Sequence, residues 1–444
     1  MIGVLKPKQE VAVSQDELSE MAATLKAALS VDDINELGRQ TGQSKRLRVV
    51  TPSRLVLALV GAMACSKVES IADLLREFNF HNGTTTAYKA FYNRLARPSF
   101  AEFMRQMLCR LLGAFAIRTL EPQADSVLSE FEDIVIQDGS SFALKDALHT
   151  VFPGRFTTLE PAAVELHATF SGFEDNVVSV SLAPDSEAER QFLPTPEQLR
   201  NKLLLADRGY GSVTFFADLT EHNASFIIRL TRTYDPWVLV VYTNGKPRVL
   251  RKPVRLRHFL AQQSRRCAFD LDVEFHRGRR SYRFRLVVLP GNEKWMTRLC
   301  TNLDRNRFLL DLVGKLYRFR WQVELNFKEW KSYANLHAFD TANEYIAEGL
   351  IWAGLCAAFL KRFLAHAAQL VSGAPISTLR VARCAKHIIG PMFSAVARAP
   401  RRVIPVFVDA LRFLLDNARR SNPERDRKSG RLQTGFALVK GGLM

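Results

Sequence analysis

The segment DIVIQDG, residues 133–139, decides the fold class, because a short β-branched run leads directly into Asp138 and a glycine. Such a run is typical of a buried β-strand that ends at a turn. A second apolar run, LLLA at 203–206, leads in the same way into Asp207. Further strand-like runs lie at 166–170, 177–182 and 226–230, and helix-like segments at 194–202 and 215–219. This alternation of strands and helices predicts an α/β layer.

Asp138 and Asp207 both stand at the carboxyl end of an expected strand. Ligands of α/β proteins usually bind at this edge of the sheet. An aspartate before a glycine at a strand end is, however, most often a turn residue. Each acid taken alone is therefore only a weak candidate for a functional site.

The composition of the whole chain is that of a folded protein with an unusual charge. Its 444 residues suggest about three structural units. Its 47% hydrophobic and 24% charged residues exclude collagen-like, low-complexity and wholly disordered chains. Lys and Arg number 62 against 45 Asp and Glu, a formal net charge of +17. This excess favours a polyanionic partner, with nucleic acid ahead of an anionic membrane surface.

The apolar runs and the cysteines favour a cytoplasmic protein. The longest uninterrupted apolar runs, 55–65 and 349–360, are too short to span a bilayer. The first residues turn polar at once and contain no signal-peptide core. The six cysteines are widely scattered and form no Cys-x-x-Cys pair. We therefore expect reduced thiols, no structural zinc site and no membrane association.

Residues 1–125 have helical patterns throughout. Two short helices are expected at 70–78 and 84–95, separated by the helix breaker Asn82-Gly83. The second helix carries aromatic and basic residues, so the pair is either a DNA-binding helix-turn-helix or an ordinary helical hairpin. A capping box formed by Ser99 and Glu102 predicts the start of another helix.

Two later segments stand outside the α/β layer. Residues 231–290 contain fourteen Lys and Arg and four Asp and Glu, a local net charge of +10. Strand-like runs in this segment lie at 237–242, 268–275 and 282–289. We expect a β-rich insertion whose basic surface contacts phosphates. Residues 341–444 return to helical patterns suited to dimerisation or DNA contact, and their apolar part at 344–370 suits a core or partner-facing helix.

The segment YRFRWQVELNFKEWK, residues 317–331, adds a third acid with basic and aromatic neighbours. It belongs to a long helix expected at about 307–333. At about 100° per residue, four of its side chains share one narrow face: Tyr317, Arg320, Glu324 and Lys331. Lys328 borders this face, whereas Glu329 points elsewhere. A solvated salt-bridge surface is the simple alternative, because Arg320 and Glu324 form an i,i+4 pair.

Three carboxylates from two strand ends and a helix suit phosphodiester chemistry. Asp138, Asp207 and Glu324 would supply the oxygen ligands that Mg²⁺ or Mn²⁺ prefers. Two such ions about 4 Å apart can stabilise the attacking and leaving oxygens of an in-line displacement. Neighbouring Arg and Lys side chains can bind phosphate. The three acids are therefore candidate metal ligands and catalytic residues.

The spacing Tyr317-x₂-Arg320-x₃-Glu324-x₆-Lys331 resembles the Y-R-E-K signature of bacterial insertion-sequence transposases. Three other segments resemble that family's first-Asp region, second-Asp region and approach to the glutamate helix: QDGS at 137–140, ADRGYG at 206–211 and TNL at 301–303. The resemblance covers roughly residues 130–340. It implies a ribonuclease H-like mixed-sheet core, a DDE triad, and a β-strand insertion between the second Asp and the Glu.

The same resemblance implies an activity and its partners. It implies cut-and-paste DNA transposition with Mg²⁺ or Mn²⁺, acting on the inverted repeats at the transposon ends and on target DNA. Tyr317, Arg320 and Lys331, with Lys328 beside them, would contact phosphates near the cut. Trp295 would stack on an unpaired base, as a tryptophan from this area does in relatives, although packing is an equal alternative.

We therefore expect a helical DNA-binding domain at 1–125, a ribonuclease H-like catalytic domain at 126–340 that contains the 231–290 insertion, and a helical C-terminal region at 341–444. We also expect a homodimer on DNA in the bacterial cytoplasm, associated with the nucleoid. The competing functions are a nuclease of the same fold without strand transfer and a non-catalytic DNA-binding repressor. Of the remaining polar residues, His167 is expected in the core and Asp185 in solvent.

Overall fold

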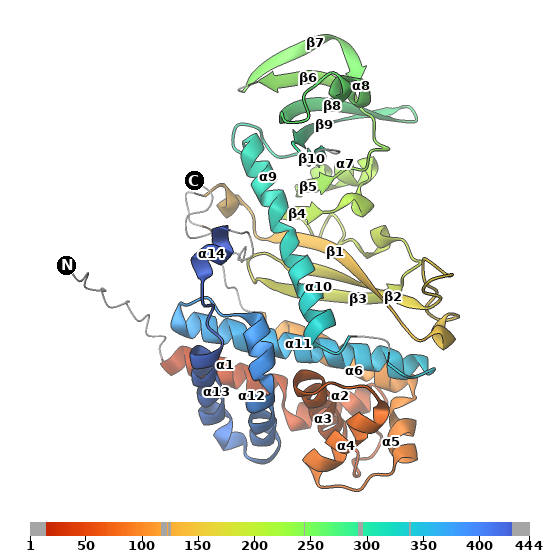
Figure 1. The fold of residues 1–444 in the computed structure, drawn as a ribbon, viewed down its shortest axis with the longest axis vertical. Coiled ribbons are helices and arrows are strands. Elements are labelled where there is room, and N and C mark those ends of the chain that lie inside the picture. Colours follow the sequence, from red (N-terminus) through yellow and green to blue (C-terminus); the bar gives the residue numbers. More distant parts are fainter. Residues whose placement is uncertain are drawn as a thin grey trace, which may run out of the picture.

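A computed structural model describes residues 15–116, 122, 126–243, 245–291, 296–336 and 339–428. Figure 1 shows a bundle of helices at one end of the molecule and a long sheet that extends away from it. The helices α9 (Leu310–Phe319) and α10 (Trp321–Tyr333) run along the sheet toward the bundle (Figure 1).

The strands that the structure describes form one ten-stranded sheet in the order β3-β2-β1-β4-β5-β10-β9-β8-β6-β7. Its first half consists of β1 (Ile134–Ala143), β2 (Ala163–Ser171), β3 (Asn176–Pro184), β4 (Leu203–Ala206) and β5 (Ser225–Arg229). Strands β1, β2 and β3 are antiparallel to one another in turn, whereas β1, β4 and β5 are parallel. Three antiparallel strands followed by two parallel strands, in the order 3-2-1-4-5, is the ribonuclease H-like arrangement. The predicted fold class is therefore confirmed.

Strand β1 is longer than the sequence predicted. We expected it to end at Asp138-Gly139, but it continues to Ala143. The second part of the strand has a partner on one side only, since Asp138 to Ala143 pair with β2 while the parallel pairing with β4 stops at Gln137. A one-sided antiparallel pairing needs no apolar run, and for this reason the polar segment was not recognised as a strand.

The 231–290 insertion continues the same sheet instead of forming a separate unit. Its elements are β6 (Trp237–Thr243), β7 (Lys246–Arg255), α8 (Leu256–Ala261), β8 (Phe269–Arg277) and β9 (Arg280–Leu289), and β10 (Thr297–Thr301) joins it to β5. The three predicted strands are confirmed, but β7 was missed. It is the edge strand and carries five basic residues and two prolines, a composition that edge strands tolerate.

The helices at the two ends of the chain pack into one bundle. The N-terminal helices are α1 (Gln15–Ala28), α2 (Val31–Gln40), α3 (Pro52–Cys65), α4 (Ile71–Asn82), α5 (Tyr88–Leu95) and α6 (Pro98–Ala114). The C-terminal helices are α11 (Glu344–Ser372), α12 (Thr378–Arg398), α13 (Val403–Asn417) and α14 (Pro423–Lys428). Their buried apolar residues belong to one hydrophobic core with those of the first half of the sheet.

Helix α11 is the central helix of this bundle. It is long and apolar enough to cross a membrane, but 89% of its most apolar 18-residue window is buried inside the protein. Figure 1 shows it lying between the sheet and the other helices. The expectation of a core helix at 344–370 is therefore confirmed.

The local signals in the N-terminal helices have mixed outcomes. The expected pair at 70–78 and 84–95 exists as α4 and α5, with Ser70 and Asp73 forming a capping box and Gly83 in the left-handed conformation. The capping box at Ser99 and Glu102 was wrong, because Pro98 takes the first position of α6 and the Ser99 hydroxyl hydrogen-bonds Gln43 instead.

Two other helix predictions need correction. Residues 194–202 form turns and no helix. The long helix expected from about residue 307 begins at Leu310, and its hydrogen-bonding pattern is interrupted at Arg320, which separates α9 from α10. The segment expected at 215–219 is the helix α7 (Val213–Glu221).

Candidate active site

The sheet places Asp138 and Asp207 side by side. In the parallel ladder between β1 and β4, the last paired residues are Gln137 and Ala206. Asp138 directly follows Gln137, and Asp207 directly follows Ala206. The two acids therefore lie at the same edge of the sheet, in register, as their position after two apolar runs predicted.

The helices α9 and α10 bring the third acid to this edge. The Arg320 guanidinium donates through Nη1 to Asp138 Oδ2 at 2.5 Å and through Nη2 to Glu324 Oε1. The Tyr317 hydroxyl donates to Asp207 Oδ1 at 3.2 Å. The two strand-end acids are thus connected to the helix by direct hydrogen bonds, which confirms that Tyr317, Arg320 and Glu324 share one face.

The three acids and Arg320 line one open pocket of about 460 Å³. Its wall includes Asp138, Gly139, Ser140, Asp207, Arg320, Glu324, Phe327, Lys328, Lys331 and Ser332. Lys331 Nζ donates to the Ser141 carbonyl oxygen at 2.6 Å, so this lysine joins α10 to the second part of β1. Lys328 is exposed at the same pocket.

Burial and charge act together on the ionisable groups of this pocket. The pKa of Asp138 is raised to about 6, by burial first and also by Glu324 and Asp207, while Arg320 and the Gly139 amide oppose the shift. The pKa of Tyr317 is also raised, by burial first and then by Asp207. Burial lowers the pKa of Arg320, but the neighbouring Asp138, Tyr317 and Glu324 outweigh it, so the guanidinium stays charged.

The pocket has the donor set of a site for a hard divalent cation. Its three carboxylates, from Asp138, Asp207 and Glu324, supply the oxygen ligands that Mg²⁺ and Mn²⁺ prefer. Among the described residues, however, no three His, Cys, Asp or Glu side chains converge as a ready-made metal cluster. The reason is local, because the Arg320 guanidinium lies between Asp138 and Glu324 and hydrogen-bonds both.

A comparison with protein families matches residues 130–360 to the transposase DDE domain. The match begins just before β1 and extends into α11, so it includes all three acids. This chain belongs to the DDE transposase family.

The transposase is also similar over most of its length to two insertion-sequence transposases of Bacillus thuringiensis subsp. berliner. It is 19% identical to the IS231B transposase, with 78% of this chain and 80% of that protein covered. It is 19% identical to the IS231C transposase, with 92% of this chain and 93% of that protein covered. A putative transposase of the Escherichia coli K12 element IS186A is 40% identical over 62 residues, which is 14% of this chain.

Among solved structures, the transposase is similar to a piggyBac transposase synaptic complex with hairpin DNA. The TM-score is 0.45 at 11% identity, with 89% of this chain and 84% of that chain covered. The family match and the Bacillus relatives show that this chain is an enzyme that acts on DNA as a DDE transposase. Membership of the family implies the use of divalent metal ions.

One contact at the transposase pocket was missed by the sequence analysis. Arg229 Nη1 lies 3.6 Å from Asp207 Oδ1. Arg229 ends β5, and its neighbour Ile228 pairs with Ala206 in the parallel ladder. The register argument that joined the two aspartates therefore also places Arg229 beside Asp207, and applying it to the third parallel strand would have found this residue.

The remaining predicted residues have different positions. Trp295 lies outside the residues that the structure describes. Glu329 faces the bundle, where it lies 3.4 Å from Arg362 and accepts a hydrogen bond from Thr378, so it points away from the pocket as predicted. Asp185 was expected in solvent but is buried, because it accepts hydrogen bonds from Ser141 and from the Arg155 amide. His167 is buried as expected.

Proposed function

We propose that this transposase moves its element by cut and paste, with metal-dependent cleavage at the transposon ends followed by strand transfer into target DNA. The observation that carries the proposal is that Asp138, Asp207 and Glu324 line one pocket, with Arg320 and Lys331 at its wall. Carboxylates for metal ions and cations for phosphate are the two requirements of in-line phosphodiester chemistry.

In this proposal Asp138, Asp207 and Glu324 hold Mg²⁺ or Mn²⁺, and we expect two ions. When bound, the metal lowers the pKa of water and stabilises the charge on the attacking and leaving oxygens. The protein supplies the orientation. The sheet register fixes Asp138 and Asp207 relative to each other, and the α10 backbone fixes Glu324.

The neighbouring side chains divide into two groups by exposure. Arg320 is only 8% exposed and Tyr317 hydrogen-bonds Asp207, so their first task is to orient the acids. Lys328 and Lys331 are exposed at the pocket and can approach the phosphates of the end being cut, Lys331 by exchanging its hydrogen bond to the Ser141 carbonyl. Tyr317 and Arg320 are close enough to the same pocket to contribute a hydroxyl and a guanidinium edge to those phosphates. Trp295 stays a candidate for base stacking.

The rest of the chain would bind and organise the DNA. We propose that the helices of residues 1–125, with α4 and α5 as the helix-turn-helix candidate, recognise the terminal inverted repeats. The helical region of residues 341–444 would support a homodimer on DNA or contact DNA itself. Because the element and its targets would be bacterial DNA, catalysis would take place in the cytoplasm, at the nucleoid.

A strand-transfer assay tests this proposal. The purified transposase is incubated with Mg²⁺, a supercoiled target plasmid and a duplex carrying the DNA that flanks its own coding region. We expect cleavage that exposes a 3′-OH at the element end, followed by joined products in the target. Cleaved ends without joined products would instead identify a nuclease, and binding without cleavage would identify a repressor.

A further inference from the structure

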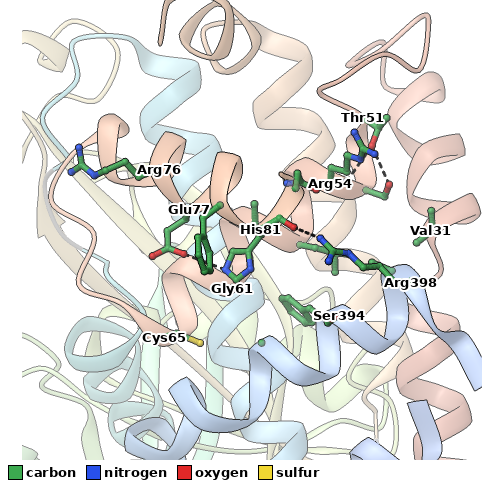
Figure 2. Close-up of a pocket in the computed structure, with 18 of the residues that line it drawn as sticks. Val31, Thr51, Arg54, Gly61, Cys65, Arg76, Glu77, His81, Ser394 and Arg398 are labelled. Carbon is green, nitrogen blue, oxygen red and sulfur yellow. Dashed lines mark hydrogen bonds and ion pairs between the residues drawn. The ribbon is translucent and has the colours of Figure 1, made fainter. Parts of the chain in front are cut away.

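A second cavity, of about 1240 Å³, lies in the helical bundle between the N-terminal helices α3 and α4 and the C-terminal helix α12 (Figure 2). Its floor consists of small and apolar side chains: Leu57, Ala58, Gly61, Gly390 and Phe393. Small residues on the facing helices leave the space between them open, and Phe80 at the rim is 83% exposed. We call this cavity the bundle groove.

Cations without acidic partners line the bundle groove. They are Arg48, Arg54, Lys386 and Arg398. The Arg54 guanidinium donates to the Val49 carbonyl at 3.2 Å, and that of Arg398 donates to the His81 carbonyl at 2.5 Å. These contacts orient the two guanidinium groups and leave their charge uncompensated. Within the described parts of the chain, none of the four cations forms an ion pair with a carboxylate.

The other charged groups of the groove have partners of their own. Arg76 forms an ion pair with Asp73, and Glu77 lies 3.2 Å from His81 (Figure 2). The four unpaired cations therefore determine the sign of the groove. Like charges that converge on one concave surface repel one another, and a polyanion that enters the groove removes this repulsion.

We propose that the bundle groove binds the phosphodiester backbone of DNA. The cations at its rim match the phosphates, and its apolar floor and Phe80 match the sugars and bases between them. The DNA comes either from the transposon end or from the target, since both have the same backbone chemistry. The proposal rests on the proposed function. It adds that the segment before α3, which carries Arg48, and helix α12, which carries Lys386 and Arg398, bind the same DNA strand.

A salt titration of DNA binding tests the groove. Arg48 comes from the segment before α3 and Lys386 from α12. Both line the groove, are exposed and make no hydrogen bond with another described residue. The double variant Arg48→Gln/Lys386→Gln should reduce the slope of log affinity against log salt by about 1.8, which is about 0.9 for each lost phosphate contact. At about 0.1 M salt the affinity should fall about tenfold or more.

Two labelled duplexes separate the two sources of DNA. One carries the DNA that flanks the coding region, and the other has an unrelated sequence. Loss of affinity for the flanking duplex alone assigns the groove to the transposon end, whereas an equal loss for both assigns it to general backbone binding such as target capture. The matched control is Lys26→Gln/Arg412→Gln, which removes two exposed cations from α1 and α13.

An unchanged salt slope for both duplexes would overturn the groove proposal. So would an equal reduction in the control variant, because the effect would then come from net charge alone. Failure of the proposed function would be distinct, since the wild-type protein itself would then fail to cleave or join the flanking duplex.

A different observation concerns three carboxylates behind the catalytic pocket. Arg155 lies 3.3 Å from Glu165, 4.0 Å from Asp185 and 3.6 Å from Glu189, so one guanidinium serves all three acids. Its backbone amide and its Nε also donate to Asp185. Glu165 and Asp185 are buried. One guanidinium faces three carboxylates, so removing Arg155 would leave these acids to repel one another and would separate them.

Two of these carboxylates touch the backbone beside the catalytic aspartates. A Cβ atom on Gly139, which follows Asp138, would overlap Glu165 Oε1. A Cβ atom on Gly209, two residues after Asp207, would overlap Glu189 Oε2. Both glycines therefore leave the space that a carboxylate of the Arg155 cluster fills.

We infer that Arg155 is a positioning residue for the catalytic acids. It keeps Glu165 against Gly139 and Glu189 against Gly209, and these contacts fix the backbone on which Asp138 and Asp207 stand. Arg155→Ala should lower the cleavage rate about ten- to a hundredfold and raise the Mg²⁺ concentration needed for half-maximal rate, with DNA affinity unchanged. Arg155→Lys should recover part of the rate, because the charge remains.

A double-mutant cycle makes this inference independent of overall stability. Gly209→Ala should reduce cleavage by displacing Glu189, and adding Glu189→Ala should cause no further loss because the space is then free. Arg200→Ala is the control, because Arg200 is exposed and lies shortly before β4. This variant should cleave like the wild type. Losses that simply multiply in the double variant, or full cleavage by Arg155→Ala, would overturn the assignment.

Discussion

The two halves of the ten-stranded sheet use charged residues in opposite ways. In the ribonuclease H-like half, charged side chains converge on one pocket, where Arg320 is buried between two acids. In the inserted half, most arginines of β8 and β9 stand exposed on the sheet, with Arg277, Arg279 and Arg280 around its β8–β9 turn. High local charge alone therefore does not mark the chemistry, whereas the convergence of charged side chains on one pocket does.

Arg285 shows why the distinction matters inside the insertion itself. It belongs to the insertion whose basic surface was expected to contact phosphates, but it is 6% exposed and donates to both Asp270 oxygens, at 3.0 and 2.8 Å. It also donates to the Phe308 carbonyl at 2.8 Å, just before α9. Arg285 thus fastens the insertion to the segment that leads into the glutamate helix, and the phosphate role expected of it is wrong.

The largest effect is expected in the catalytic half. Asp138→Asn removes one carboxylate from the metal-binding set while keeping its size, so cleavage should fall by roughly a thousandfold or more. Affinity for DNA should change little, because the substitution removes no basic side chain that could bind a phosphate. Parallel cleavage and gel-shift measurements on the flanking duplex check this, and near-normal cleavage by the variant would remove Asp138 from the proposed site.

The next effect is one of stability, in the inserted half. Arg285→Ala leaves the buried Asp270 carboxylate with Arg305 as its remaining ion-pair partner, at 3.1 Å. Removing one partner of a buried ion pair costs about 3–5 kcal/mol when the other charge is left uncompensated. Because Arg305 still faces Asp270, we expect a loss near the lower end of this range. Urea unfolding of the purified variant measures the loss. A change below about 1 kcal/mol would return Arg285 to the exposed, phosphate-contacting class.

The exposed arginines of the insertion should show the reverse pattern. Arg277→Gln/Arg279→Gln/Arg280→Gln should leave the unfolding free energy nearly unchanged, because all three side chains are exposed. It should reduce the salt slope of DNA binding by up to about 2.7, for three lost phosphate contacts. If the slope and the affinity stay at the wild-type values, this surface faces solvent or another protein.

The smallest effect separates Lys331 from an ordinary surface lysine. Lys331→Ala should weaken end binding and cleavage about tenfold, and Lys331→Arg should keep part of both because the charge remains. Lys315→Ala is the matched control, since Lys315 is exposed on α9 and does not line the pocket. Glu329 is unsuited to this purpose because it packs against Arg362 and Thr378. Equal losses at positions 331 and 315 would show that the helical face does not define the site.

The sequence predicted the catalytic half of the fold better than its surroundings. Strands β4 and β5 are fully paired and apolar, so their composition identified them, and the positions of Asp138 and Asp207 followed. The polar end of β1 and the basic edge strand β7 were missed because strands with one free side carry no apolar signal.

The candidate site was predictable where it depended on spacing and not where it depended on distant partners. Helical spacing placed Arg320 and Glu324 on one face, but it could not show that Arg320 reaches across to Asp138, 182 residues away. The buried position of Asp185 depends on Arg155 and Ser141, which come from separate segments of the chain. Such contacts exist only after the sheet has formed.

The central claim is that Asp138, Asp207 and Glu324 hold metal ions in one site. Replacing Mg²⁺ by Fe²⁺ and generating hydroxyl radicals with ascorbate and peroxide cuts the protein backbone next to the bound ion, and the fragments map its position. We predict cuts beside residues 138, 207 and 324 together, all lost in Asp138→Asn and all suppressed by excess Mg²⁺. Cuts beside only one of these residues, or at an unrelated cluster, would contradict the account.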